Sequence, residues 1–132
     1  MVLLILYHFK KNKSLVPIKS IEYEPKNQTD SKTLIVNYIG NNYTNPVLSL
    51  QEIAANTNVK GSDISKILIE QFSLSFKEYL NYVRITETKK LLKNSELNIS
   101  EIAYLVGYNN VTHFNRVFKS TENISPNEYR IK

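Results

Sequence analysis

One pattern occurs twice in the chain, about fifty residues apart, and this repeat limits the possible folds more than any other feature. Residues 49–54 read SLQEIA and match residues 98–103, NISEIA, at an offset of 49 positions. Beyond a predicted turn the two copies match again, at an offset of 50. These matches join Ile64, Lys66, Leu68, Ser75, Glu78 and Tyr79 to Phe114, Arg116, Phe118, Ser125, Glu128 and Tyr129. Such a repeat indicates that one supersecondary unit is used twice.

The later copy, residues 98–130, has the pattern of two helices with a sharp turn between them. Apolar residues at helical spacing predict the first helix, and Gly107 supplies the left-handed backbone position at which such a helix ends. Asn109 is a preferred N-cap and predicts the start of the second helix. A capping box at 125–128, SPNE, predicts a third helix with Pro126 at its first position. The unit is therefore a helix-turn-helix with a short helix behind it.

The second helix of this copy has two faces of different character. Its buried stripe is predicted to consist of Phe114, Val117 and Phe118. Tyr108, just before the helix, is also expected in the core. The outward face keeps small side chains and one arginine, namely Val111, Thr112, Asn115 and Arg116. A second helix with such a face fits the major groove of double-stranded DNA.

The outward side chains of this helix suit the edges of DNA bases. Arg116 can hydrogen-bond both O6 and N7 of guanine, and Asn115 can pair in a similar bidentate way with adenine. Thr112 and Val111 offer methyl groups to thymine. For Arg116 an alternative stays open, in which it is a surface arginine paired with Glu122 or with a phosphate. These residues form the predicted base-reading surface.

The residues around the start of this helix are assigned supporting roles. Asn109 and Asn110 lie at its N-terminal turn, so they are predicted to cap the helix and to contact phosphates. His113 is one of two histidines in the chain, and the other, His8, lies far away in the sequence. A metal site needs converging ligands. We therefore expect His113 to pack or to contact a phosphate, and we predict no metal site.

The earlier copy predicts a second recognition helix over residues 61–72. Its core stripe consists of Ile64, Ile67 and Leu68. Its predicted DNA-facing side chains are Ser62, Ser65 and Lys66. Asp63 adds an anion beside them, and residues 49–75 contain two lysines against three acids. Each missing phosphate contact weakens binding, because fewer counterions are released from DNA. We therefore expect the first copy to be the weaker DNA reader.

These motifs together resemble the DNA-binding domain of the AraC/XylS family of bacterial transcription regulators. The match runs from about residue 31 to 131 and is most specific in ISEIAYLVGYNNVTHFNRVFK followed by ISPNEYR. The resemblance implies an all-α fold of about seven helices, with two tandem helix-turn-helix lobes joined by a long linker helix. It also implies two recognition helices in adjacent major grooves of double-stranded DNA, with RNA polymerase as a further partner. Lys60 departs from the family's usual capping serine, and Ile69 from its common lysine.

The linker helix is visible in the residues between the copies. Ser75 and Glu78 form a predicted capping box that opens a helix reaching about Asn94. Twenty residues give a rod of about 30 Å, close to the length of about 34 Å for one DNA turn. Lysines 89, 90 and 93 are expected to form a solvated face, with phosphate contact as the alternative. Another capping box is predicted at residues 49–52, and residues 31–42 predict a helix that packs on the first lobe.

Residues 1–30 lie outside the resemblance and are predicted to form an extension and linker, with the DNA-binding domain at 31–132. The apolar start, MVLLILYHF, is shorter than the roughly 20 residues that a membrane span needs. Its lysines follow the apolar run, whereas a secretory signal carries its charges in front. Our hypothesis is that it preserves the tail of a transmembrane segment from a longer sensor-regulator. The alternative is a short strand or helix that packs on the domain or frays.

Composition excludes several classes of function. The chain has no cysteine, so it has neither disulfides nor Cys-based zinc sites, which fits the cytoplasm. The net charge is +5, but residues 31–132 carry 12 Lys and Arg against 9 Asp and Glu, so charge alone argues weakly for DNA. With three glycines, no phosphate-binding loop and no nucleophile beside a histidine base, we predict no enzyme and no cofactor. The alternative to DNA binding is a degenerate or truncated helical protein-interaction module.

Overall fold

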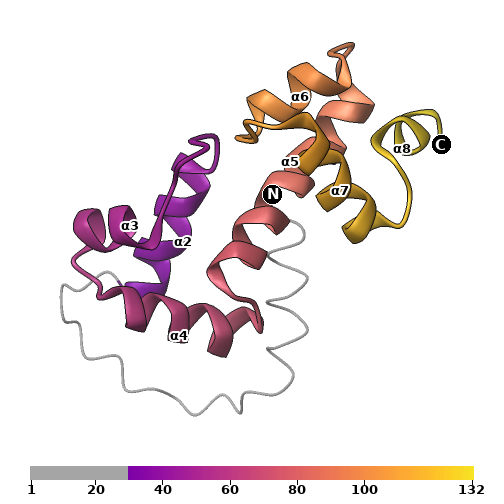
Figure 1. Cartoon of the computed structure of the whole chain (residues 1–132). Coiled ribbons are helices and arrows are strands. Elements are labelled where there is room, and N and C mark those ends of the chain that lie inside the picture. The colour runs from indigo at the N-terminus through magenta and orange to yellow at the C-terminus, as the bar shows by residue number, and fades with distance from the viewer. Residues whose placement is uncertain (1–29) are drawn as a thin grey trace.

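The computed structural model describes residues 30–132, which form seven helices and no strand (Figure 1). The helices are α2 (Ser31–Asn42), α3 (Leu50–Thr57), α4 (Gly61–Phe72), α5 (Phe76–Asn94), α6 (Ile99–Leu105), α7 (Val111–Glu122) and α8 (Pro126–Ile131). This confirms the predicted all-α fold. The predictions for residues 1–29, including the membrane hypothesis, lie outside the described residues. No helix from Ser31 onward is long and apolar enough to cross a membrane.

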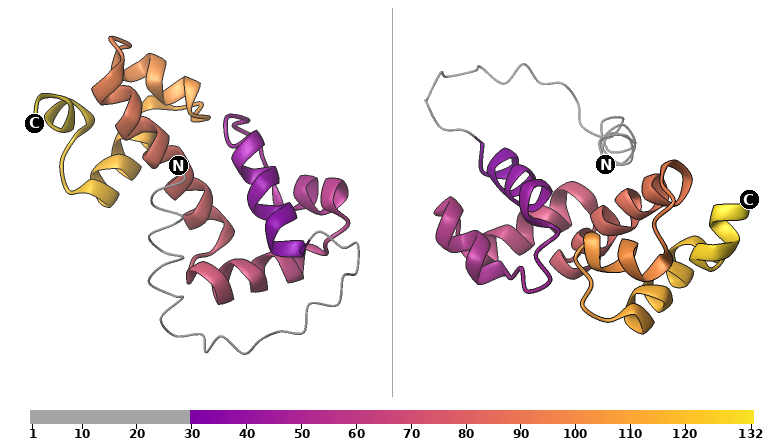
Figure 2. Two further views of the ribbon diagram at one scale, coloured as in Figure 1. Left: turned by 180° about the vertical axis from the view of Figure 1, so that it is seen from behind. Right: turned by 90° about the horizontal axis from the view of Figure 1, so that it is seen from above.

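The helices form two lobes that are joined by α5 (Figures 1 and 2). We call residues 31–83 the first lobe and residues 85–131 the second lobe. The core of the first lobe consists of Ile35, Ile39, Leu48, Ile53, Ile64, Leu68, Phe72, Tyr79, Leu80 and Val83. The core of the second lobe consists of Ile85, Leu92, Ile102, Ala103, Val106, Tyr108, Phe114 and Phe118. Each lobe therefore buries its own apolar cluster, as the repeat predicts.

The long helix α5 begins and ends where the sequence predicts. The hydroxyl of Ser75 accepts a hydrogen bond from the Glu78 backbone N–H at 3.2 Å, and the Glu78 carboxylate accepts one from the Ser75 N–H at 2.7 Å. This reciprocal pair satisfies backbone donors that would otherwise be unpaired at the helix start. A second full capping box, which the sequence reading missed, joins Asn98 and Glu101 at the start of α6.

Two of the predicted capping boxes are only half formed. Ser49 accepts from the Glu52 N–H at 3.2 Å, but the Glu52 carboxylate accepts from the Tyr38 hydroxyl at 3.1 Å and from Asn45 Nδ2 at 3.4 Å. The carboxylate thus ties α3 to α2 and to the loop between them. At the start of α8, residue 125 caps through its hydroxyl, while the carboxylate of residue 128 accepts from that hydroxyl instead of from the backbone.

The lysines of α5 differ from the predicted solvated face in one respect. Lys90 and Lys93 are exposed, as expected. Lys89 is half-buried, and its Nζ lies 3.1 Å from Glu122 Oε1 at the end of α7. Its prediction as a solvated residue is wrong, because a partner 33 positions later in the chain draws it against the second lobe.

Candidate nucleic-acid interface

Helix α7 turns polar side chains to solvent and aromatic ones to the core. Thr112, Asn115 and Arg116 are exposed, as predicted, whereas the rings of Phe114 and Phe118 are 0% exposed. Val111 differs from the prediction, since it is half-buried and packs against the second-lobe core. Residues 111, 114 and 118 are spaced i, i+3 and i+7, so Val111 lies beside the stripe that Phe114 and Phe118 bury. The outward face is therefore polar from its first turn onward.

Of the two asparagines predicted to cap α7, Asn110 caps it, and the prediction for Asn109 is wrong. Asn110 Oδ1 accepts a hydrogen bond from the His113 backbone N–H at 2.9 Å, and Asn110 has extended backbone torsions. Asn109 lies one residue outside the cap and is exposed. The cap uses one acceptor of Asn110 and leaves its amide N–H groups free to donate at the helix N-terminus, a position that favours anions.

An aromatic cluster fixes where α7 begins. Gly107 has φ +103°, the positive value predicted for the turn. Tyr108 is buried, its hydroxyl donates to Asn81 Oδ1 at 2.8 Å, and its ring lies edge-on to Phe114 at 5.3 Å. The His113 ring packs on Tyr108 at 5.8 Å, which confirms its packing role. Burial raises the pKa of Tyr108 to about 12, with the nearby Arg84 guanidinium acting in the opposite direction.

Lys119 belongs to the outward face of α7 but was not among the predicted residues. It is exposed and lies seven positions after Thr112 and three after Arg116. Residues at i, i+3, i+4 and i+7 share one face of a helix. Extending the face of residues 112, 115 and 116 by one more turn would have found it. The lysine adds a second cation to this surface.

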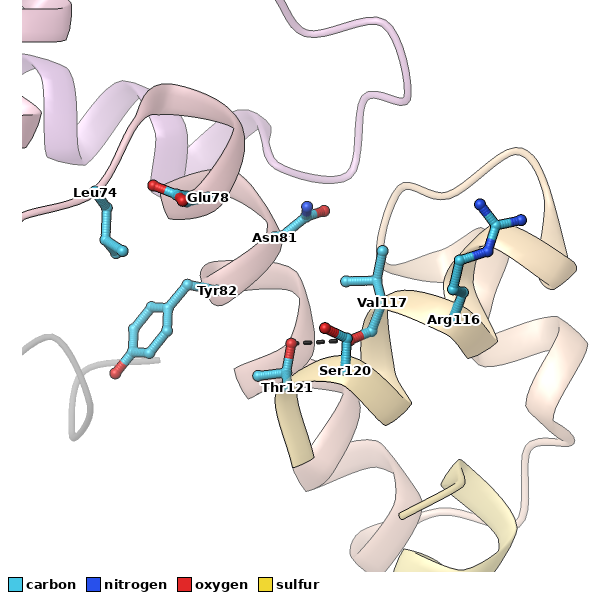
Figure 3. A pocket seen from close by; sticks show the side chains of 8 residues that line it. All are labelled: Leu74, Glu78, Asn81, Tyr82, Arg116, Val117, Ser120 and Thr121. Carbon is cyan, nitrogen blue, oxygen red and sulfur yellow. Dashed lines mark hydrogen bonds between the residues drawn. The ribbon is translucent and has the colours of Figure 1, made fainter. Parts of the chain in front are cut away.

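Arg116 is not engaged by the acid that the sequence offered as its partner. Glu122 pairs with Lys89, and within residues 30–132 no carboxylate lies within ion-pair distance of Arg116. Figure 3 shows its guanidinium pointing away from Glu78 and Tyr82 on α5. The Glu122 alternative is therefore not the arrangement in the structure. The guanidinium donors remain available for a ligand of the outward face.

An open cleft of about 410 Å³ lies between the start of α5 and the side of α7. Its lining consists of Leu74, Glu78, Asn81, Tyr82, Arg116, Val117, Ser120 and Thr121 (Figure 3). The Thr121 hydroxyl is used within α7, where it donates to the Val117 carbonyl at 2.8 Å. The cleft marks the groove between the lobes, and Arg116 stands at its edge.

The first lobe presents the corresponding face on α4. The helix begins at Gly61, as predicted, and its N-cap Lys60 makes no side-chain cap hydrogen bond. Ser62 and Lys66 are exposed, while Ser65 is half-buried. The face of α4 thus resembles that of α7 in position, but its first turn lacks the side-chain acceptor that Asn110 provides in the second lobe.

Three further side chains of α4 reduce its attraction for a polyanion. Asp63 is exposed in the first turn, and Lys66 Nζ lies 3.9 Å from Glu70 Oε1 on the same exposed surface. Ile69 is 57% exposed at the position that corresponds to Lys119 in α7. Its side chain offers no charge to a phosphate. The face of α4 is therefore less basic than the face of α7.

The titratable side chains of the described residues do not converge on one point. From residue 30 to 132, no group of three or more His, Asp or Glu side chains is placed to bind a metal ion.

Comparisons with known proteins place this geometry in context. A family model described as a helix-turn-helix domain matches residues 53–132. A stretch of 66 residues is 41% identical to the TCP pilus virulence regulatory protein of Vibrio cholerae serotype O1, covering 50% of this chain and 24% of that protein. The chain therefore spans about a quarter of the length of this curated relative.

Solved structures share the arrangement of the helices. The C-terminal domain of AraT, a response regulator from Geobacillus stearothermophilus, superposes with a TM-score of 0.73 at 30% identity, over 80% of this chain and 87% of that one. The DNA-binding domain of AdpA, a global transcriptional factor solved with a target DNA, gives a TM-score of 0.72 at 16% identity, over 78% and 92%. At that identity the second likeness concerns the fold alone.

Proposed function

The chain belongs to the AraC/XylS family of helix-turn-helix transcription regulators, and on that premise we propose that residues 31–132 form a DNA-binding domain that reads two adjacent major grooves. The observation that carries the proposal is that Arg116 forms no ion pair with a carboxylate of residues 30–132. It lies on the polar face of α7, beside Asn115 and Thr112. The repeated face on α4 supplies the second reading surface. Double-stranded DNA is the partner that both faces suit.

The linker helix supports this arrangement through its length. The 19 residues of α5 span about 28 Å. Two recognition helices that enter successive major grooves on one side of B-DNA lie about 34 Å apart. A rod of this length, with one lobe at each end, is of the same order as that separation.

The side chains on the outward face of α7, and those at its start, then each have a chemical role. The guanidinium of Arg116 reads guanine O6 and N7, the amide of Asn115 reads adenine, and the methyl of Thr112 contacts thymine. Asn109 and the free amide donors of Asn110 contact phosphates at the helix start. Val111, half-buried, contributes at most the outer part of its side chain. Lys119 adds a phosphate contact one turn further on.

The first lobe has a smaller set of contacts. Lys66 binds a phosphate in competition with Glu70, and the hydroxyls of Ser62 and Ser65 contribute neutral hydrogen bonds. In this proposal the first lobe anchors the protein on DNA and the second lobe selects the sequence.

A salt titration of DNA binding by the full chain tests the proposal. The probe is a duplex that the protein selects from a randomised library, with a scrambled duplex of the same composition as the control. We expect the logarithm of the association constant to fall linearly with the logarithm of salt concentration, by about 0.9 for each phosphate neutralised. Selection of no duplex, or binding that is insensitive to salt, contradicts the proposal.

The alternative of a protein-interaction module has one observation in its favour. Tyr104 and Leu105 are adjacent on α6 and both exposed, although they are large and apolar. An exposed apolar patch of this kind suits contact with a protein partner. Salt-insensitive binding to DNA would leave the interaction module as the better account.

Within the regulatory function we propose RNA polymerase as a protein partner, a sensor or membrane segment elsewhere in the natural protein, and action in the cytoplasm.

A further inference from the structure

Arg84 lies at the middle of α5, between the two cores, and is 6% exposed. Its Nε donates a hydrogen bond to the Tyr43 carbonyl at 2.8 Å, and its Nη2 donates to the Asn45 carbonyl at 2.8 Å. Both carbonyls belong to the loop between α2 and α3 in the first lobe. One side of the buried guanidinium is thus bound to the first lobe.

The opposite contacts of Arg84 come from the second lobe. Its guanidinium carbon lies 5.2 Å from the centroid of the Tyr108 ring, a distance suited to a cation–π interaction. Gly107 lies beside it, and a Cβ atom there would overlap the Tyr43 carbonyl oxygen and lie 2.9 Å from Arg84 Nε. The turn of the second lobe therefore closes on the first lobe with no room for a side chain.

Two more contacts make this region continuous. The Tyr43 side chain packs against the cores of both lobes. Asn81, from the first-lobe half of α5, accepts the hydrogen bond of the Tyr108 hydroxyl. We call Tyr43, Asn81, Arg84, Gly107 and Tyr108 the interlobe joint.

Simple packing does not require a charge at this position. A buried guanidinium is costly unless hydrogen bonds satisfy it, and an apolar side chain of similar volume is often as stable. What an arginine adds is direction, because its planar fork holds two carbonyls at fixed angles. A leucine could fill the space but could not hold the α2–α3 loop in register with the turn at Gly107.

We propose that the interlobe joint fixes the orientation of the lobes, and that Arg84 is thereby a positioning residue that restricts the spacing of the DNA half-sites. The second clause rests on the proposed DNA-binding function, whereas the first does not. One inserted base pair shifts the half-sites by about 3.4 Å and rotates them by about 35°. Lobes held rigidly tolerate such a change poorly.

The orientation is measured without DNA by pulsed electron paramagnetic resonance on the full chain. Ser62→Cys and Thr112→Cys place spin labels at corresponding exposed positions of α4 and α7, and the chain has no native cysteine to interfere. We expect one narrow distance distribution, which Arg84→Leu broadens. A distribution as narrow in Arg84→Leu as in the parent overturns the proposal.

Arg130 offers a matched control. Its Nε donates to the Leu92 carbonyl at 3.1 Å and its Nη2 to the Leu97 carbonyl at 2.6 Å, so it also binds two backbone carbonyls, but both lie in the second lobe. Arg130→Leu is expected to lower the melting temperature and to leave the distance distribution narrow. Equal broadening by Arg130→Leu and Arg84→Leu contradicts a specific role for the joint.

Two milder variants keep the test valid if Arg84→Leu does not fold. Arg84→Lys retains the charge but cannot hold both carbonyls in the arginine's geometry, so we expect a width between the parent and Arg84→Leu. Gly107→Ala inserts the Cβ that the joint excludes, so we expect the mean distance to shift. If both folded variants keep the parent distribution, the joint does not set the orientation.

Binding to altered spacings tests the functional clause. The probes are the selected duplex and the same duplex with one base pair inserted or removed between the half-sites. We expect the parent to prefer the original spacing, and Arg84→Leu to bring that preference towards a ratio of one, while Arg130→Leu retains it. If Arg84→Leu keeps the full preference, the functional clause fails. If no duplex is selected at all, the proposed function and this clause fail, while the resonance result decides the joint itself.

Discussion

The two lobes bury equivalent stripes but differ on the faces that they turn to solvent. Ile64 and Leu68 of α4 and their counterparts Phe114 and Phe118 of α7 are all fully buried. The outward faces have diverged, since α7 is capped by a side chain and carries the exposed Lys119 in its last turn, whereas α4 has no side-chain cap and carries the exposed Ile69 at the corresponding position. The fold thus depends on the apolar stripe, and the outward residues are free to differ in what they bind.

The turns of the two helix-turn-helix units show how different residues reach one backbone shape. In the second lobe Gly107 has φ +103°, and in the first lobe Asn58 occupies the corresponding left-handed position with φ 57°. Asparagine tolerates this region better than most residues with a side chain. Glycine is required in the second lobe because the first lobe lies against it, whereas Asn58 is exposed and has space for its side chain.

The largest effects should come from the shared stripe. Phe118→Ala should lower the free energy of unfolding by about 3–5 kcal/mol, and its counterpart Leu68→Ala by about 2–5 kcal/mol, because each leaves a cavity in a closed core. Urea denaturation followed by far-ultraviolet circular dichroism measures both. A negligible loss from either variant would mean that the lobes do not rely equally on their cores.

Each lobe contains one buried tyrosine. Burial raises the pKa of Tyr79 in the first lobe and of Tyr108 in the second to about 12. Because the folded-state pKa lies above the ordinary value near 10, the fold favours the neutral hydroxyl. The contribution of each hydroxyl to the free energy of unfolding is therefore fully present below about pH 10. It is lost as the pH rises towards 12, by about 2–3 kcal/mol for a fully buried hydroxyl. Unfolding measured from pH 8 to 12 should show this decline.

Phenylalanine substitutions separate the two hydroxyls at neutral pH. The Tyr108 hydroxyl donates to Asn81, so Tyr108→Phe should cost about 1 kcal/mol. The Tyr79 hydroxyl is buried without a hydrogen-bond partner among the described residues, so Tyr79→Phe should be neutral or stabilising. Both variants should flatten the alkaline decline, and the exposed Tyr104→Phe serves as the control. A steeper decline in either variant would contradict the assignment.

The caps provide a third and smaller contrast. Asn110→Ala should destabilise the second lobe by about 1 kcal/mol, since the His113 N–H loses its acceptor. Lys60→Ser should stabilise the first lobe by a similar or smaller amount by adding the missing acceptor. Thermal melting at constant pH measures both. Loss of stability in Lys60→Ser would show that the lysine makes a contribution other than capping.

The smallest expected effect concerns the anion on α4. Asp63→Ser removes a negative charge from the first turn of the recognition helix, so binding to DNA should tighten, and most at low salt. Glu96→Ser, which removes an exposed acid from the second lobe outside α7, is the control for net charge. Equal tightening by both variants would attribute the effect to net charge and not to the position of Asp63.

Sequence reasoning succeeded where local chemistry determines the structure. The bounds of α4 and α5 follow from an apolar stripe and from the Ser75–Glu78 box, whose partners are three residues apart. It failed at Asn109 because two adjacent asparagines fit the cap equally well in sequence, and only the helix register selects the second. The first-lobe contacts of Arg84 lie 41 and 39 positions away, so no local pattern could reveal the interlobe joint.

The central claim is that the second lobe reads the sequence while the first anchors the protein. Affinities of Arg116→Ala and Lys66→Ala for the selected and scrambled duplexes test it most directly. Arg116→Ala should cost about 1–3 kcal/mol on the selected duplex and relax the preference at one base pair. Lys66→Ala should weaken binding by a similar factor on both duplexes and reduce the salt slope by about 1. A change of base preference in Lys66→Ala, with none in Arg116→Ala, would contradict the claim and reverse the roles of the lobes.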